Sequence, residues 1–169
     1  FLICQCGIVA IHGPSVAGRL GRGVDAYDRD SFLASLSDPR PLGEMTAAGL
    51  QAMRPGDARG RLMGGTLTQL AAAAGTPYAL APWDDTILVL EDVAERPYRL
   101  DRMLTQLRLS GALTHVRGIV LGTFPRCDEA NGVLTAQSAL ADALADFRGP
   151  IVFGFPTGHV DGPADALRA

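Results

Sequence analysis

The stretch Ile87-Leu88-Val89-Leu90-Glu91-Asp92 runs four apolar residues directly into two acids. The apolar run predicts a buried strand, and a carboxylate at the exit of such a strand is held by a rigid scaffold. In that position it can orient a histidine or bind a cation. A second apolar run, residues 151–155, leads to Gly158 and His159. The chain therefore offers Glu91 as a candidate acid and His159 as a candidate base, without a serine in the sequence context of a nucleophile.

The second half of the chain alternates between strand and helix patterns. Alternating elements of this kind favour parallel strands with helices covering the sheet. We expect strands at residues 86–90, 118–122 and 151–155, and helices at residues 97–109 and 135–147.

The first half of the chain is less regular. Thr66 and Gln69 have the spacing of a capping box at the start of a helix. Upstream we expect a strand at 7–11, a short capped helix at 31–36, an irregular stretch at 37–55, and a strand at 59–63 ended by Gly64 and Gly65. The whole predicts an α/β fold with a mixed sheet and helices mainly on one side.

Length and composition limit the function classes. With 169 residues, of which 47% are hydrophobic and 20% charged, the chain suffices for one domain with a substantial core. Its net charge of -3, without a basic run, argues against nucleic acid as a partner. All fifteen basic residues are arginine, so chemistry that needs a lysine of this chain is excluded, including Schiff bases and phosphate-binding loops.

The cysteines and the N-terminal residues bear on location. The three cysteines form no CxxC pair, which favours a reducing compartment. Residues 1–4 are apolar but lack a basic lead, so we expect neither a signal peptide nor a membrane span. The expected location is the cytoplasm. A start at Phe1 without Met, and an end shortly after His159, suggest a piece of a longer protein.

Several motifs follow one another in an order that resembles one family. They are His12-Gly13-Pro14, Gly64-Gly65-Thr66-Leu67, Gly75-Thr76-Pro77-Tyr78, Leu90-Glu91-Asp92 with Glu95, Pro97-Tyr98-Arg99 and Asp101-Arg102, and Gly158-His159. The series resembles the C-terminal half of the LD-carboxypeptidases, a serine peptidase family that includes the microcin C immunity peptidases. The resemblance covers residues 7–161, and residues 90–102 are its strongest part.

The resemblance implies a two-domain enzyme. An N-terminal α/β domain, absent from this chain, would carry the nucleophilic serine on a tight turn, where backbone amides form the oxyanion hole. Residues 1–169 would form the C-terminal domain, a swivelling β/β/α three-layer structure that contributes the Glu and His of the triad. By motif match these are Glu91 and His159.

The resemblance also implies a reaction. The family hydrolyses the bond between an L-centre diamino acid and a terminal D-alanine in cytoplasmic murein peptides, during cell-wall recycling, without a metal or other cofactor. The implied partners are the murein peptide and the N-terminal domain, and we include a homodimer among the candidates. An immunity peptidase that acts on a peptide antibiotic is the alternative within the family.

Five further residues are candidates for substrate contact. Gly64 and Gly65 would let the backbone approach a ligand closely. Thr66 departs from the family, which commonly has Asn there, so it keeps a hydroxyl and loses an amide donor. His12 could line a cleft, although His-Gly-Pro is also ordinary turn chemistry. Arg102 could bind a terminal carboxylate, unless the charges around it form a solvated helix face.

Other assignments stay open on sequence alone. Glu91 could cap the following helix, for which Asp92 is the better candidate, and His159 could be a solvated loop residue. A metal hydrolase could use Glu91, Asp92, His159 and Asp161. A non-catalytic swivelling or interaction domain is the third reading. Ser15 lacks the Gly-x-Ser-x-Gly elbow of a nucleophile.

The triad reading makes a geometric prediction. Glu91 and His159 should lie at the same edge of the sheet, within hydrogen-bond reach or one water apart. The double glycine at Gly64 and Gly65 should border the same concavity. The surface around it should be open and partly apolar, where the N-terminal domain packs.

Overall fold

The computed structural model describes residues 6–38, 40, 44–80, 84–160 and 167–168. Its main element is a five-stranded sheet in the order β2-β6-β5-β4-β3. Strands β3 to β6 are parallel, and β2 pairs antiparallel with β6 at one edge. The strands are β2 (Gln51–Arg54), β3 (Arg61–Thr66), β4 (Thr86–Glu91), β5 (Val116–Leu121) and β6 (Ile151–Phe153). The predicted mixed α/β sheet is confirmed.

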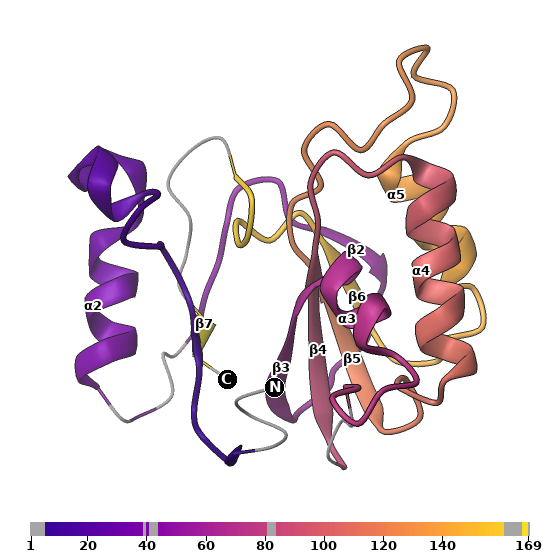
Figure 1. Ribbon diagram of the computed structural model, residues 1–169, viewed down its shortest axis with the longest axis horizontal. Coiled ribbons are helices and arrows are strands. Elements are labelled where there is room, and N and C mark those ends of the chain that lie inside the picture. Colours follow the sequence, from indigo (N-terminus) through magenta and orange to yellow (C-terminus); the bar gives the residue numbers. More distant parts are fainter. Residues whose placement is uncertain (1–5, 39, 41–43, 81–83, 161–166, 169) are drawn as a thin grey trace.

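Three helices connect the parallel strands and cover one face of the sheet (Figure 1). They are α3 (Leu67–Ala73), α4 (Pro97–Leu109) and α5 (Ala136–Ala143). The main core lies between these helices and the sheet, where Leu88 and Leu90 of β4 pack with Leu104 of α4. Connecting helices lie on one face of a sheet when successive strand-helix-strand units all cross over with the same hand.

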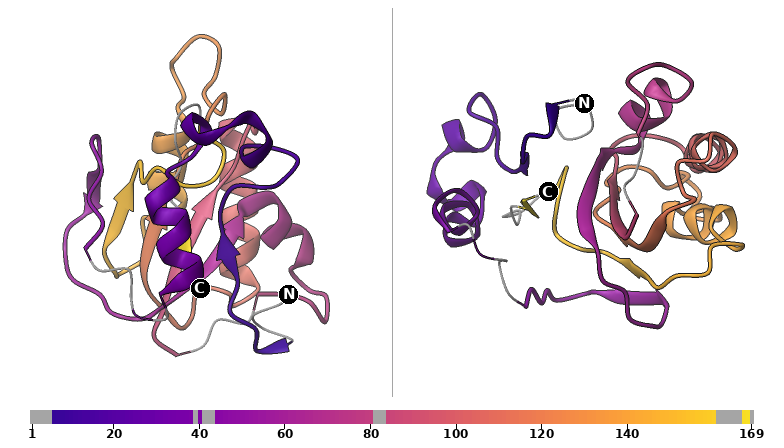
Figure 2. Two further views of the ribbon diagram at one scale, coloured as in Figure 1. Left: turned by 90° about the vertical axis from the view of Figure 1, so that its left-hand side faces the viewer. Right: turned by 90° about the horizontal axis from the view of Figure 1, so that it is seen from below.

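A second layer lies on the opposite side of the sheet from α4 and α5 (Figures 1 and 2). It contains η1 (Leu20–Arg22), η2 (Val24–Ala26), α2 (Arg29–Ser37) and a two-stranded antiparallel pair, β1 (Ile11–His12) with β7 (Leu167–Arg168). The arrangement of small sheet, large sheet and helices fits the three layers that the family resemblance implied. No helix within the described ranges is both long and apolar enough to cross a membrane.

The double glycine does not end β3, contrary to the prediction. The strand runs on through Gly64 and Gly65 to Thr66. A Cβ at Gly64 would overlap the carbonyl oxygen of Val89 on the neighbouring strand. Glycine at this position therefore allows the two strands to approach closely, and it does not end the strand.

Other predicted boundaries also shift. The irregular stretch at 37–55 contains β2, which the sequence pattern missed because this short edge strand depends on its pairing with β6. The strand at 7–11 is reduced to β1 at its end. Helix α2 begins before residue 31, because Asp28 accepts a capping bond from the Ser31 amide at 2.6 Å. Helix α4 has the predicted bounds.

Helix α5 ends at Ala143, four residues before the predicted end. Beyond it the backbone amides of Ala145 and Phe147 bond three residues back, so the chain tightens into turns. Leu144 is buried in the core and Phe147 packs against it. The predicted apolar face is thus correct although the last turn is not α-helical.

Candidate active site

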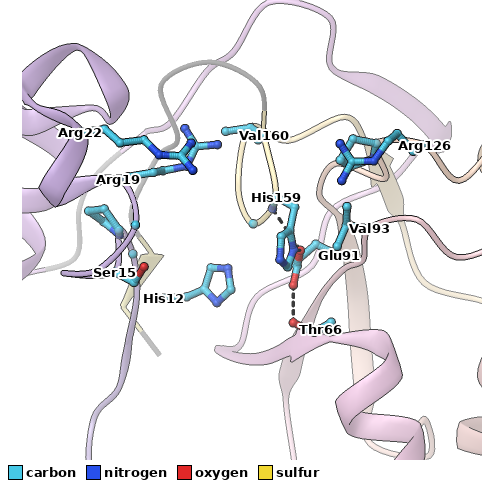
Figure 3. Close-up of a pocket in the computed structure, with 15 residues that line it drawn as sticks. His12, Ser15, Arg19, Arg22, Thr66, Glu91, Val93, Arg126, His159 and Val160 are labelled. Atoms are coloured by element: carbon cyan, nitrogen blue, oxygen red, sulfur yellow. Dashed lines mark hydrogen bonds and ion pairs between the residues drawn. The ribbon is translucent and has the colours of Figure 1, made fainter.

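Glu91 and His159 form a hydrogen-bonded pair at the carboxyl-terminal edge of the sheet (Figure 3). Glu91 ends β4 and is 1% exposed, whereas the His159 side chain, in the loop after β6, is 52% exposed. Nδ1 of His159 lies 2.7 Å from Oε2 of Glu91, and the His159 backbone amide donates to the same oxygen at 3.1 Å. A carboxylate on Nδ1 favours a proton there, which leaves the Nε2 lone pair as a base. The predicted proximity is confirmed.

The loop that carries His159 is fixed from β5, the strand between β4 and β6. The hydroxyl of Thr123, just after β5, lies 3.2 Å from the carbonyl oxygen of Thr157 and 3.0 Å from that of His159. Gly158 has a φ of +88°, and a Cβ there would overlap the Glu91 carboxylate. Only glycine both adopts this backbone conformation readily and leaves room for the carboxylate.

Thr66 holds the second oxygen of the same carboxylate. It is the residue beside Glu91 in the β3-β4 ladder, and its hydroxyl donates to Oε1 of Glu91 at 2.6 Å. Both Glu91 oxygens therefore have partners. The predicted capping box is wrong: Thr66 occupies the N-cap position of α3, but its side chain makes no capping bond. Its contact with substrate stays a prediction.

Asp92 is buried and has a different task from Glu91. Its Oδ2 accepts bonds from the backbone amide and the hydroxyl of Thr68, both at 2.8 Å, and its Oδ1 accepts from the Val93 amide. Thr68 lies in the first turn of α3. Asp92 is therefore a helix cap, as expected, but it caps α3 and not the helix that follows it.

A cavity of about 490 Å³ opens over the Glu91-His159 pair (Figure 3). One wall comes from the ends of the sheet strands and includes Thr66, Glu91 and His159. The other comes from the end of β1 and the segment that leads to η1, and includes His12 and Ser15. The site therefore lies between the large sheet and the small layer that faces it.

Gly64 and Gly65 lie next to this cavity. They line a small hollow of about 30 Å³, which shares His12 and Glu91 with the main cavity. The structure thus brings the predicted residues Gly64, Gly65, His12 and Thr66 to the same place as the Glu91-His159 pair. Their contact with a ligand stays a prediction.

Arg102 is the one candidate that the structure does not bring to the site. It is exposed on α4 and is not among the residues that line the cavity. Nearby, Arg99 pairs with Glu95 at 3.3 Å with i,i+4 spacing. The alternative of a solvated helix face therefore describes this part of α4, and the prediction that Arg102 binds the substrate is not supported.

The described serines include one at the cavity, Ser15. Its carbonyl oxygen accepts bonds from the amides of Gly18 and Leu20, which places it in a tight turn. Across the described ranges no hydrogen bond joins a serine hydroxyl to His159, and the imidazole Nε2 has no protein partner there. A nucleophile is therefore not paired with this base within the described chain.

The described oxygens that a metal hydrolase would use as ligands are engaged in hydrogen bonds within the protein. The oxygens of Asp92 are taken by Thr68 and Val93, and those of Glu91 by Thr66 and His159. Asp161 lies outside the described residues. In the part of the chain that the structure describes, no three potential ligands cluster in a way that could hold a metal ion.

Sequence reasoning assigned no role to three residues of the site, of which Thr123 and Gly158 position His159, and Gly158 had been named only as part of a motif. The third is Arg126, which lines the cavity from the loop after β5. Parallel strands end at one edge of the sheet, so the loop after the middle strand could have been searched for side chains that reach the site.

Two comparisons with relatives place the chain among peptidases. The family model described as LD-carboxypeptidase C-terminal domain matches residues 59–165. A protein named murein tetrapeptide carboxypeptidase, from Pseudomonas aeruginosa, is 34% identical over 163 residues, which cover 90% of this chain and 52% of that protein. A Streptomyces coelicolor relative with a provisional carboxypeptidase name is 38% identical over 158 residues, 94% of this chain and 49% of its own.

Solved structures agree with these matches. The muramoyltetrapeptide carboxypeptidase from Oxalobacter formigenes superposes with a TM-score of 0.76 at 29% identity, over 96% of this chain and 55% of that one. The wild-type microcin C7 self immunity protein gives a TM-score of 0.80 at 20% identity, over 99% of this chain and 58% of that one. This is a likeness of fold alone. The chain spans about half the length of the curated relatives that it matches.

Proposed function

We propose that this chain, which belongs to the LD-carboxypeptidase family as its C-terminal domain, is part of a serine carboxypeptidase that releases terminal D-alanine from murein tetrapeptides. The main supporting observation is the buried Glu91 carboxylate bound to Nδ1 of His159, with Nε2 free of a partner among the described residues and beneath a cavity of about 490 Å³. The substrate is suggested by the names of the relatives from Pseudomonas aeruginosa and Oxalobacter formigenes.

His159 is proposed as the general base and then the general acid. Its Nε2 takes the proton of a serine hydroxyl while the serine oxygen attacks the scissile carbonyl carbon. The same proton then passes to the amine of D-alanine, the C–N bond breaks, and an acyl-enzyme remains. A water molecule repeats the sequence and frees the shortened peptide.

Glu91 is proposed as the residue that orients His159. Its bond to Nδ1 keeps the tautomer in which Nε2 is the base, and its charge stabilises the imidazolium after proton transfer. Thr66 and the His159 backbone amide hold the carboxylate in this position. The reaction so described needs no metal or other cofactor.

We propose that the nucleophilic serine lies outside this chain, on a further domain that would border the open side of the cavity. Two observations support this proposal: the described serine hydroxyls make no bond to His159, and the matched relatives are about twice as long as the match. The site would act in the cytoplasm, on peptides of cell-wall recycling.

The test uses the intact protein that contains this chain and a synthetic tetrapeptide ending in D-alanine on an L-centre. We expect D-alanine release by the wild type, unchanged by a metal chelator, and its loss in His159→Ala. Loss of activity with the chelator would support the metal hydrolase instead. Equal behaviour of the wild type and His159→Ala would support a non-catalytic domain.

A further inference from the structure

Arg126 lies in the loop between β5 and α5 and lines the same cavity as Glu91 and His159. In the view of Figure 3 it stands beside Val93 on one side of His159, whereas Arg19 and Arg22 stand on the other side. A cationic side chain thus reaches the cavity from the strand-end wall that also carries the base.

The backbone at Arg126 has an unfavourable conformation for a residue with a side chain. Its φ is +59°, in the left-handed region that favours glycine. Both flanks are fixed, since Phe124 and Cys127 are buried and the Pro125 carbonyl accepts a bond from the Ala94 amide at 3.0 Å. A strained residue held by rigid neighbours points to a function for its side chain.

Charge in the cavity also points to a ligand. Arg126 is exposed, and among the described residues it makes no ion pair or hydrogen bond. In contrast, Arg96, Arg99, Arg108 and Arg117 all pair with acids. Among the described residues that line the cavity, Glu91 is the only acid, and it is buried against His159. The accessible charge that the described residues give the cavity is therefore positive, in a chain whose net charge is -3.

We infer that Arg126 binds the terminal carboxylate of the peptide substrate and so makes the site selective for the last residue of a chain. The inference rests on the proposed function. In a carboxypeptidase substrate this carboxylate is on the residue whose amine leaves, so it must lie close to the imidazole that protonates that amine. Arg126 shares a wall with His159, and its guanidinium can take a carboxylate through two parallel bonds.

The test compares two peptides on the intact protein: the tetrapeptide acid and the same peptide with a C-terminal amide. Arg126→Gln should lower kcat/KM for the acid by about 10- to 100-fold, because a charged hydrogen-bonded partner is lost. For the amide the change should stay below about 3-fold, since that peptide lacks the charge that Arg126 recognises. Arg102→Gln is the matched control, because it removes an exposed arginine outside the cavity and should affect neither peptide.

Arg126→Gly separates recognition from a structural role. Glycine relieves the positive φ, so the variant should unfold at a temperature no lower than that of the wild type. It should nevertheless lose the preference for the acid. A drop in stability, or an equal loss of kcat/KM on both peptides, would show that Arg126 merely supports the loop.

Failure of the proposed function is distinguishable from failure of this inference. If the wild type releases D-alanine and Arg126→Gln works equally well on the acid, only the inference is wrong. If the wild type releases none, the proposed function is wrong, and calorimetric binding of the two peptides decides the inference. Tighter binding of the acid by the wild type than by Arg126→Gln would sustain it, and equal or no binding would overturn it.

Discussion

The hydroxyl of Thr66 donates to Oε1 of Glu91 at 2.6 Å, while the opposite oxygen of that carboxylate binds His159. Thr66 and Glu91 are direct neighbours in the parallel ladder of β3 and β4. The contact is therefore set by strand register, and it holds the carboxylate from the side opposite the imidazole.

Thr66→Val should lower kcat/KM on the tetrapeptide by about 10- to 100-fold, because a bond to a buried charged group is lost. Thr66→Ser keeps a hydroxyl and should retain activity within about 3-fold of the wild type. Steady-state kinetics of the intact protein provide the measurement. Equal activity of the Val and Ser variants would show that this hydroxyl does not position Glu91.

Glu91→Gln should reduce turnover by on the order of 10²- to 10⁴-fold, since the amide has nearly the same shape but cannot stabilise an imidazolium. Asp92→Asn should act mainly on stability, because Asp92 caps α3. Kinetics and thermal unfolding of both variants separate the two acids. A crippled Asp92→Asn beside a mild Glu91→Gln would mean that the wrong acid has been assigned.

Gly158→Ala should abolish activity, because the added Cβ overlaps the Glu91 carboxylate that holds His159. Gly132→Ala is a matched control: its φ of +67° is also strained for alanine, but its Cβ would meet nothing within 4 Å. Both variants should lose a similar amount of stability from backbone strain. If Gly132→Ala were as inactive as Gly158→Ala, the overlap would not be the cause.

Burial raises the pKa of the Cys127 thiol, so the folded protein favours its neutral form. As the pH rises, the thiol ionises first in the unfolded chain. The free energy of unfolding should therefore fall once the pH exceeds the ordinary pKa of a cysteine thiol. Denaturant titrations between about pH 7.5 and pH 10 should show a smaller fall for Cys127→Ala than for the wild type. The thiol should also react with iodoacetamide much more slowly in native than in unfolded protein.

The family and the second half of the fold were predictable from sequence. The run into Glu91 and the bounds of α4 are local signals, since a buried strand and an amphipathic helix each leave a periodic pattern. The proximity of Glu91 and His159 also followed, because parallel strands end at the same edge of a sheet.

The remainder depends on tertiary contacts that leave no local pattern. Gly64 was predicted to end its strand, and only the close approach of Val89 shows why glycine is needed there. β2 is a strand because it pairs with β6. Thr66 has the spacing of a capping residue, yet a carboxylate 25 positions away takes its hydroxyl. Arg126 gave no signal, since an arginine in a loop is ordinary until the cavity is known.

The pairing of Glu91 with His159 joins residues 68 positions apart. β5 must pair with both β4 and β6 before the two strand ends can meet, so the site depends on contacts of high sequence separation. Such contacts close large loops and form slowly during folding. After dilution from denaturant, helical content should therefore return before the His159 imidazole contacts the Glu91 carboxylate. The rate at which activity returns would then measure how fast the sheet is completed.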